Sequence, residues 1–462
     1  MFKISEMKNA IIAATFVFAF TGCDAESNNT TTTPSTSEEE IKAITYIKNE
    51  FNISNPNPRK IDLISMMSGN PGIFVYQNEG LKYLIVPGVS DADRTIRENA
   101  PRGKTFVFYK DHKSWSTYTI EEDIASTWTI RNFDSNSDFF ILGDANEIGL
   151  NWQDWAGDII KGVPNNGKIT WSRVNTETEM GFYHDVSLGN LNSDGITDIL
   201  GVGFNVFMGN HSGYSFQDGA SLFEYNFNRP FAFELYDLDN DGIDELISAD
   251  YHEEYGTLQS NRISIHKLNS QDQKFKQVFT SKDSKAFFNE DRGATSIYVE
   301  DFNNDGLVDI SVAREVSGSE SFEVWLNNDN FNFSPHFSKE FSCNEFNFLE
   351  YEVMDANLDG YLDIILRPET CGGIPTSSFQ FSSYSEYGKG IQLNDCIWLN
   401  DGNAKFYKYT QKELTTPIWV NYLYPYMENN KLHFVGFEYD ELFYNEIDNS
   451  LKVNIVDFEI NF

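Results

Sequence analysis

The chain has 462 residues, with 34 Lys and Arg against 70 Asp and Glu, for a formal net charge of −36. This acidic excess excludes nucleic acid and anionic lipid surfaces as main partners, because both are bound through basic patches. Hydrophobic residues make up 40% of the chain and aromatic residues 15%, which excludes wholesale disorder. At this length we expect either several domains or a repeat architecture.

Residues 1–22 have the features of a secretory signal. Two lysines precede a run of apolar or small residues from Ala10 to Phe20, and this run is too short for a hydrocarbon core that needs about twenty residues. Two small residues then precede Cys23, an arrangement that resembles the lipobox of bacterial lipoproteins. The resemblance implies acylation of Cys23 and a lipid-anchored protein of the bacterial cell envelope, facing the periplasm or the exterior, with no other membrane contact. The alternative is an ordinary secretory signal with an incidental cysteine.

Residues 23–60 are expected to form a flexible tether and a short helix. The stretch from Asp24 to Ser37 is rich in Ser, Thr, Asn and Pro and has no apolar periodicity. From Glu38 to Phe51 apolar residues recur at loosely helical spacing after three glutamates, which favour the first turn of a helix. The folded body is then expected over residues 61–462.

Four segments of the body share one nine-residue template, with Asp or Asn at positions 1 and 3, Asp at 5, Gly at 6 and a carboxylate at 9. Apolar stretches of alternating pattern flank each segment, so the repeated unit is strand, acidic loop, strand. We name the loops by their first residue. Their candidate ligands are Asn190, Asn192, Asp194 and Asp198; Asp237, Asp239, Asp241 and Glu245; Asp301, Asn303, Asp305 and Asp309; and Asp355, Asn357, Asp359 and Asp363.

The spacing of these oxygen side chains predicts calcium. Side chains at positions 1, 3 and 5 of such a loop share one side, the glycine permits a sharp turn, and six or seven hard oxygen ligands suit Ca²⁺ better than Mg²⁺. An EF-hand would need Glu at position 12, and the residues there are Gly, Ser, Val and Leu. The alternative is a set of plain Asx-rich turns, which leaves the carboxylate at position 9 unexplained. We predict about four structural Ca²⁺ ions.

Acidic loops of this type between short strands resemble FG-GAP/VCBS repeats, the propeller blades of integrin α-subunits and of many bacterial surface proteins. Two later segments, Trp325 to Phe333 and Trp398 to Phe406, are similar to the hairpin of that family. The resemblance covers roughly residues 125–410 and implies an all-β chain, a β-propeller. Strand clusters predict about seven blades, over 61–125, 126–182, 183–230, 231–294, 295–348, 349–412 and 413–462, with six or eight blades as the alternatives. We expect the runs 451–456 and 457–462 to pair with the first blade and close the ring.

No catalytic constellation is evident: the chain has no G-x-S-x-G motif and no pair of histidines at zinc-ligand spacing. The resemblance implies a non-catalytic binding or adhesion module, which we expect to be monomeric and to bind a protein or a glycan. The alternatives are a polysaccharide lyase or hydrolase on a propeller scaffold, and an envelope assembly factor. A cluster of His, Lys, Arg and carboxylates at the mouth of one propeller face would favour the enzyme.

Three cysteines remain besides Cys23. Cys371 and Cys396 flank an insertion, so a disulfide between them is a candidate in an oxidising compartment. The alternative is that these two and Cys343 are buried free thiols.

Overall fold

The computed structural model divides the chain into two units, Met1–Ile41 and Lys42–Phe462. The residues described all lie in the second unit, and they are 43–54, 74–78, 80–86, 106–111, 114–119, 127–132, 139–144, 159–165, 167–176, 185–201, 205–224, 232–249, 263–281, 293–316, 319–341, 351–367, 392–417, 420–438, 443–445 and 450–462. The predicted signal and Cys23 lie outside them. Within these ranges no helix is long and apolar enough to cross a membrane.

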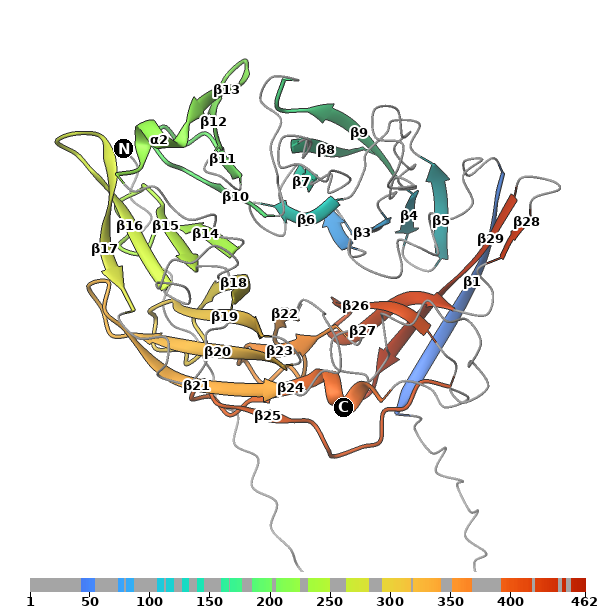
Figure 1. The fold of residues 1–462 in the computed structure, drawn as a ribbon. Coiled ribbons are helices and arrows are strands. Elements are labelled where there is room, and N and C mark those ends of the chain that lie inside the picture. Colours follow the sequence, from blue (N-terminus) through green and yellow to red (C-terminus); the bar gives the residue numbers. More distant parts are fainter. Residues whose placement is uncertain are drawn as a thin grey trace, which may run out of the picture. The chain divides into compact units, whose positions relative to one another are not determined.

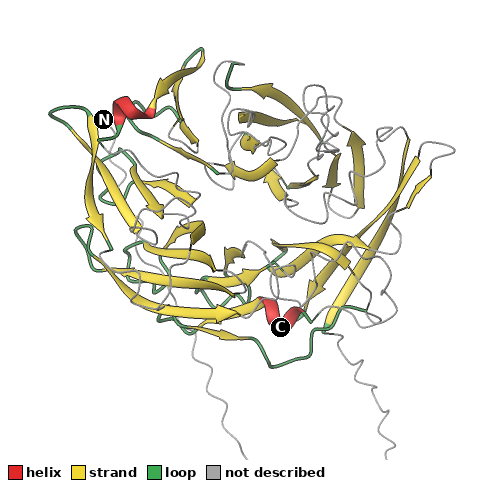
Figure 2. Cartoon of the chain, in the orientation of Figure 1, coloured by secondary structure: helices red, strands yellow, loops and turns green. Residues whose placement is uncertain are grey.

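The regular secondary structure of the described residues is nearly all β, and the strands form seven antiparallel sheets (Figure 2). We number the sheets as blades one to seven in chain order. Blade one holds β2 (Phe74–Asn78), β3 (Leu81–Val86), β4 (Phe106–Asp111) and β5 (Ser114–Thr119); blade two holds β6 (Thr127–Asn132), β7 (Phe140–Asp144), β8 (Ile159–Asn165) and β9 (Lys168–Arg173). Blade three holds β10 (Val186–Gly189), β11 (Asp198–Gly201), β12 (Asn205–Asn210) and β13 (Gly213–Asp218), followed by the short helix α2 (Gly219–Leu222).

Blades four to seven complete the set. Blade four holds β14 (Ala232–Tyr236), β15 (Glu245–Ala249), β16 (Ile263–Asn269) and β17 (Lys274–Thr280); blade five holds β18 (Gly293–Glu300), β19 (Asp309–Val316), β20 (Ser319–Asn327) and β21 (Phe333–Phe341). Blade six holds β22 (Tyr351–Met354), β23 (Asp363–Leu366), the 3₁₀ helix η5 (Leu393–Cys396), β24 (Ile397–Asn400) and β25 (Phe406–Lys408). Blade seven holds β26 (Val420–Glu428), β27 (Lys431–Glu438), β28 (Phe443–Asn445) and β29 (Ser450–Ile460), together with β1 (Ile44–Ser54).

The sheets follow one another as the blades of a propeller (Figure 1). In blades one to six the four strands are hydrogen-bonded in chain order. The first strands contact one another from blade to blade, β6 with β10, β10 with β14 and β14 with β18, and β2 contacts β26. This arrangement confirms the prediction of an all-β, seven-bladed propeller. Each sheet lies within its predicted span, apart from the start of β18 and the addition of β1.

The core lies between neighbouring blades. In one cluster Tyr76 and Ile85 of blade one pack with Phe140 and Leu142 of blade two, all of them buried. The rings of Tyr76 and Phe140 lie 4.7 Å apart between centroids. Similar clusters join blades two and three, three and four, and four and five. Each blade therefore buries its apolar side chains against its neighbours, which explains the high aromatic content.

The prediction of a short helix over residues 38–51 is wrong for the part that the structure describes. Strand β1 pairs with β29 over its whole length, from Ile44 opposite Ile460 to Ser54 opposite Ser450. This pairing supplies backbone partners to the open edge of the last sheet, whereas a short isolated helix is marginal in water. Residues 44–54 therefore belong to blade seven, inside the segment expected to precede the propeller.

The ring is closed in a different way from the one predicted. The two C-terminal runs, expected to pair with blade one, instead form the single strand β29 inside blade seven, between β1 and β27. The N-terminal strand thus completes the last blade, so the two ends of the propeller are joined by backbone hydrogen bonds.

Candidate metal-binding loops

The four predicted loops occupy the same place in four consecutive blades. Each joins the first strand to the second, in blades three, four, five and six. Position 9 begins the second strand and pairs with the last residue of the first, as Asp309 does with Glu300 and Asp363 with Met354. The structure therefore brings the predicted ligands of each loop together at one end of its own blade.

Positions 1, 3 and 5 turn their oxygens into the loop. In the 301 loop, Asp301 accepts hydrogen bonds from the backbone N–H groups of Asp305 and Gly306, at 3.1 and 2.8 Å. Asn303 Oδ1 accepts from Asp305 N at 3.0 Å, and Asp305 Oδ1 accepts from Leu307 N at 2.8 Å. The 355 loop repeats all four bonds with its own residues. The two loops are therefore folded alike.

The backbone of these loops is left-handed at two positions. Position 6 has φ of 88° at Gly306 and 90° at Gly360, which only glycine adopts without cost. Position 4 is also left-handed, with φ of 56° at Asn304 and 63° at Leu358. Asparagine tolerates this conformation, whereas an exposed leucine does not favour it. The loop geometry is thus kept at Leu358 in spite of local strain.

The carboxylates at position 9 are buried and tie each loop to its sheet. Asp309 accepts hydrogen bonds from Phe302 N at 3.1 Å and from Asn327 N, in the third strand, at 2.9 Å. Asp363 does the same with Ala356 N and Asn400 N, at 3.0 and 2.8 Å. Burial and the neighbouring carboxylates raise the pKa of Asp309 and of Asp363 to about 7.

The donor set of the 301 and 355 loops fits Ca²⁺. Each loop carries three carboxylates and one asparagine, and each carboxylate oxygen has a second lone pair beyond the hydrogen bond it accepts. Among the described residues, no lysine or arginine forms an ion pair with these carboxylates; they accept hydrogen bonds from backbone amides and from Asn303 or Asn357. Crowded, partly buried negative charge of this kind favours a bound cation.

The 237 loop differs because a lysine lies among its carboxylates. Lys267 Nζ, from β16, is 2.8 and 2.6 Å from the two oxygens of Asp239, 2.6 Å from Asp241 Oδ2 and 3.0 Å from Glu245 Oε1. Although burial lowers it, these hydrogen bonds hold the pKa of Lys267 above its ordinary value. Burial raises the pKa of Glu245 in spite of the lysine.

The 190 loop carries the fewest charges and is hydrogen-bonded to the 237 loop. Asn190 Nδ2 donates to Gly242 O at 2.9 Å, and Asn190 N donates to Asp244 Oδ2 at 2.6 Å. Only Asp194 and Asp198 carry charge in this loop. Burial raises the pKa of Asp198 to about 6. The loops of blades five and six are linked in a similar way, by Asn304 Nδ2 and Gly360 O at 2.9 Å.

One of the two cysteines of the candidate disulfide, Cys396, lies among the described residues. Cys396 is buried at the end of η5, while Cys371 and Cys343 lie outside the described residues. The pairing of Cys371 with Cys396 stays a prediction.

Sequence reasoning missed a buried ionic cluster between blades one and seven. We call it the closure cluster; its members are Lys82 of β3, Lys110 of β4, Tyr426 and Glu428 of β26, His433 of β27 and Asp457 of β29. Lys110 Nζ lies 2.6 Å from both Glu428 Oε2 and Asp457 Oδ2, and Lys82 Nζ lies 2.8 Å from Glu428 Oε1.

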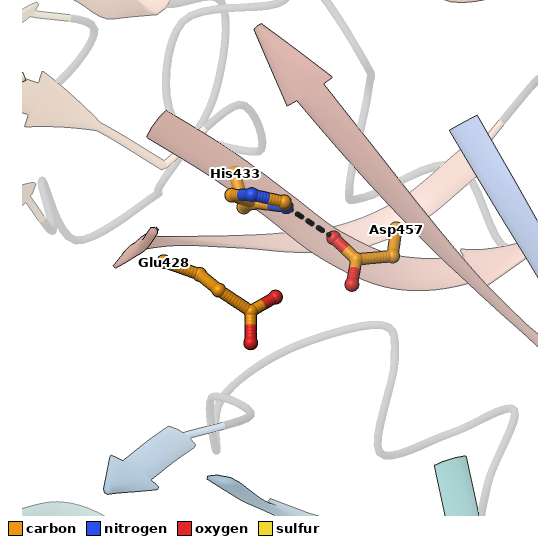
Figure 3. Close-up of side chains that lie close together, drawn as sticks. All are labelled: Glu428, His433 and Asp457. Carbon is orange, nitrogen blue, oxygen red and sulfur yellow. Dashed lines mark hydrogen bonds and ion pairs between the residues drawn. The ribbon is translucent and has the colours of Figure 1, made fainter. Parts of the chain in front are cut away.

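Three members of the closure cluster have the arrangement of metal ligands. Atoms of Glu428, His433 and Asp457 lie within 4.8 Å of one another, and Figure 3 shows His433 Nδ1 bonded to Asp457 Oδ1, at 3.0 Å, with Glu428 beside them. The Lys110 ammonium, however, already contacts both carboxylates, and Tyr426 OH donates to Asp457 Oδ2 at 2.7 Å. The cluster is therefore neutralised by the chain itself.

The pKa shifts in the closure cluster agree with neutralisation by its own charged groups. Although burial raises it, the bonds and charges of His433 and Lys110 hold the pKa of Asp457 below its ordinary value. Burial lowers the pKa of Lys110, but Asp457 and Glu428 more than compensate and raise it. Burial, together with the charge of Asp457, raises the pKa of Tyr426. In the sequence, the only signs were single titratable residues within apolar strands, such as Lys82, Lys110 and Asp457.

Comparison with known proteins gives one family. The model of the FG-GAP-like repeat matches residues 237–312 and 301–366, the part that holds the 237, 301 and 355 loops. No curated protein matches the chain.

Among solved structures the chain is similar to several at low identity. A chain in a structure of S. cerevisiae dbp5 bound to nup159 and gle1 is 8% identical with a TM-score of 0.41, over 90% of this chain and 95% of that one. Trypanosoma rangeli sialidase is 11% identical with a TM-score of 0.36, over 84% and 54%. The Nup133 β-propeller domain of Vanderwaltozyma polyspora is 8% identical with a TM-score of 0.34, over 83% and 100%. At these TM-scores the similarities carry no argument.

The sheets and their repeated loops define the chain as a seven-bladed β-propeller. Within this propeller, residues 237–312 and 301–366 match the FG-GAP-like repeat, and these repeats carry the 237, 301 and 355 loops.

Proposed function

We propose that this protein is an exported, lipid-anchored propeller that Ca²⁺ stabilises and that binds a protein or a glycan without catalysis. One observation carries the calcium part. The 301 and 355 loops each gather three carboxylates that, among the described residues, no lysine or arginine neutralises.

Calcium would be held in blade five by Asp301, Asn303, Asp305 and Asp309, and in blade six by Asp355, Asn357, Asp359 and Asp363. The ion would supply charge neutralisation. The chain supplies rigidity, since the carboxylate at position 9 is bonded to the third strand of its sheet. A more weakly charged site of the same kind is proposed in the 190 loop. These ions are proposed as structural, with no part in chemistry.

The arrangement of the closure cluster favours binding over catalysis. It contains the histidine, lysines and carboxylates that an enzyme would use, but Lys110, His433 and Asp457 are each at least nine-tenths buried and bonded to other members. Buried groups that are already bonded to one another would stabilise the contact between blades one and seven. A lyase, a hydrolase or an envelope assembly factor is the alternative.

The binding proposal is tested with protein and glycan arrays, probed with the full chain in calcium and again in chelator. We expect a bound protein or glycan whose signal falls in chelator, and no change in the length of a bound polysaccharide. Depolymerisation of a polysaccharide by the wild type would show an enzyme instead.

The anchor proposal is tested with Cys23→Ser. We expect this variant to move from the membrane fraction to the soluble fraction and to lose labelling by a fatty-acid analogue, with the melting temperature of the propeller unchanged. A variant that fractionates with membranes like the wild type would overturn the anchor.

A further inference from the structure

Lys267 occupies the centre of the 237 loop. Its ammonium contacts four oxygens of three carboxylates, all within 3.0 Å, and its side chain is 24% exposed. By composition this loop should be the strongest calcium site of the four, since residues 237–245 hold five carboxylates. The structure instead places a cation of the chain where the oxygens converge.

The sheet register shows that, among blades three to six, only blade four has a lysine opposite position 9 of its loop. In that blade Leu246 pairs with His266, so Glu245 stands opposite Lys267. The same extension of the register places Asp309 opposite Leu326 in blade five and Asp363 opposite Leu399 in blade six. In blade three the corresponding residue is Met208. Three blades thus carry an apolar side chain where blade four carries a lysine.

Blade four also differs from the other three blades in the residue at position 9. In the other three blades, position 9 is Asp and accepts a hydrogen bond from a third-strand backbone amide, that of Gly209, Asn327 or Asn400. In blade four, position 9 is Glu245, and its Oε1 accepts from Lys267 Nζ instead. The longer side chain brings the carboxylate to the ammonium, so the two replacements act as a pair.

A lysine in this position competes directly with a metal ion. Ca²⁺ would need the oxygens of Asp239, Asp241 and Glu245, which are those that the ammonium contacts. Both cations cannot share this centre, because they repel each other at such short distances. A tethered ammonium has the further advantage that it is always at the site, at any calcium concentration.

We propose that Lys267 is the built-in cation of blade four, which replaces Ca²⁺ in the 237 loop. The inference rests on the proposal that the sister loops at 301 and 355 bind Ca²⁺. It follows that blade four keeps its loop folded in the absence of calcium, whereas blades five and six depend on the ion.

The test is the calcium stoichiometry of the full chain, stripped with chelator and titrated in a calorimeter. We expect Lys267→Met, which restores the side chain that blade three has at this position, to bind one equivalent more than the wild type. Adding Asp241→Ala to that variant should remove the extra equivalent. In the wild type, Asp241→Ala should leave the stoichiometry unchanged, and loss of one equivalent there would overturn the inference. The inference would also be overturned if Lys267→Met bound no more calcium than the wild type.

Two controls separate this inference from the proposed function. Asp305→Ala in the wild type should lose one equivalent; if it loses none and the wild type binds no calcium, the proposed function fails. The melting temperature in chelator then tests the role of Lys267 separately from calcium binding. There we expect Lys267→Met to melt below the wild type, while Lys276→Met, at a surface ion pair with Asp272, melts like it. Equal melting of Lys267→Met and the wild type in chelator would refute the built-in cation.

Discussion

Replacing Lys110 with methionine should loosen the joint between the first and last blades. Lys110 Nζ lies 2.6 Å from Glu428 and from Asp457, and the lysine side chain is only 6% exposed. Methionine keeps the length of the apolar stem. It removes the ammonium, which lies 5.7 Å from the ring centroid of Trp115 and 5.8 Å from that of Tyr426. The change therefore removes the charge and its contacts.

The expected loss follows from the burial of the partners. Removing one member of a buried ion pair typically costs about 3–5 kcal/mol, because the other charge stays buried and uncompensated. Here Asp457 keeps His433 and Tyr426, and Glu428 keeps Lys82, so we expect the lower end, about 3 kcal/mol. A propeller of this size has an unfolding entropy of roughly 0.9 kcal/mol per degree, so the melting temperature should fall by about 3 °C.

The assay is thermal unfolding at pH 7 in calcium, with Lys431→Met as the matched control. Lys431 is also in blade seven and pairs with Glu459, but its side chain is 43% exposed, and surface pairs contribute about 1 kcal/mol or less. The control should shift the melting temperature by less than about 1 °C. Equal shifts for the two variants would refute the reasoning that the closure cluster stabilises the ring.

Two further predictions concern ring closure and pH. Deletion of residues 44–54 should expose the edge of β29, lower the melting temperature and promote aggregation, seen by light scattering; a truncated chain that melts and scatters like the wild type would contradict this. In chelator, the folded chain binds protons near pH 7 at Asp309 and Asp363 that the unfolded chain, with pKa values near 3.8, does not bind. Its melting temperature should therefore rise as the pH falls from 8 to 6.5 and rise less in Asp309→Asn/Asp363→Asn, whereas equal slopes would contradict the raised pKa values. Buried His266, whose pKa is lowered from 6.5 to about 4, acts in the opposite direction as the pH falls from about 7 to 4.

The loops could be predicted from the sequence because their information is local. The candidate ligands of each loop lie within nine residues, and the spacing of Asp305, Gly306 and Asp309 reflects one turn of backbone that every repeat must make. Alternation of apolar residues marks the flanking strands in the same local way. The number of blades then follows from counting the clusters of strands, four of which carry such a loop.

What the sequence did not reveal depends on contacts between distant parts of the chain. Residues 44–54 carry a weak helical pattern, which pairing with a strand four hundred residues later overrides. The closure cluster joins Lys82 and Lys110 to Asp457 across the ends of the propeller. Lys267 reaches Glu245 only because β15 and β16 are neighbours, and the glutamate at position 9 was the one visible sign.

The most direct test of the account is the melting temperature of the full chain in chelator and in calcium. Extracellular calcium modules have Kd values of ~10⁻⁴–10⁻³ M, and at ten times Kd each site adds about 1.4 kcal/mol. At that calcium concentration the 301 and 355 sites together should therefore raise the melting temperature by about 3 °C, and Asp305→Ala/Asp359→Ala should remove this part of the rise. Identical melting in chelator and in calcium, with no calcium bound in calorimetry, would contradict the account.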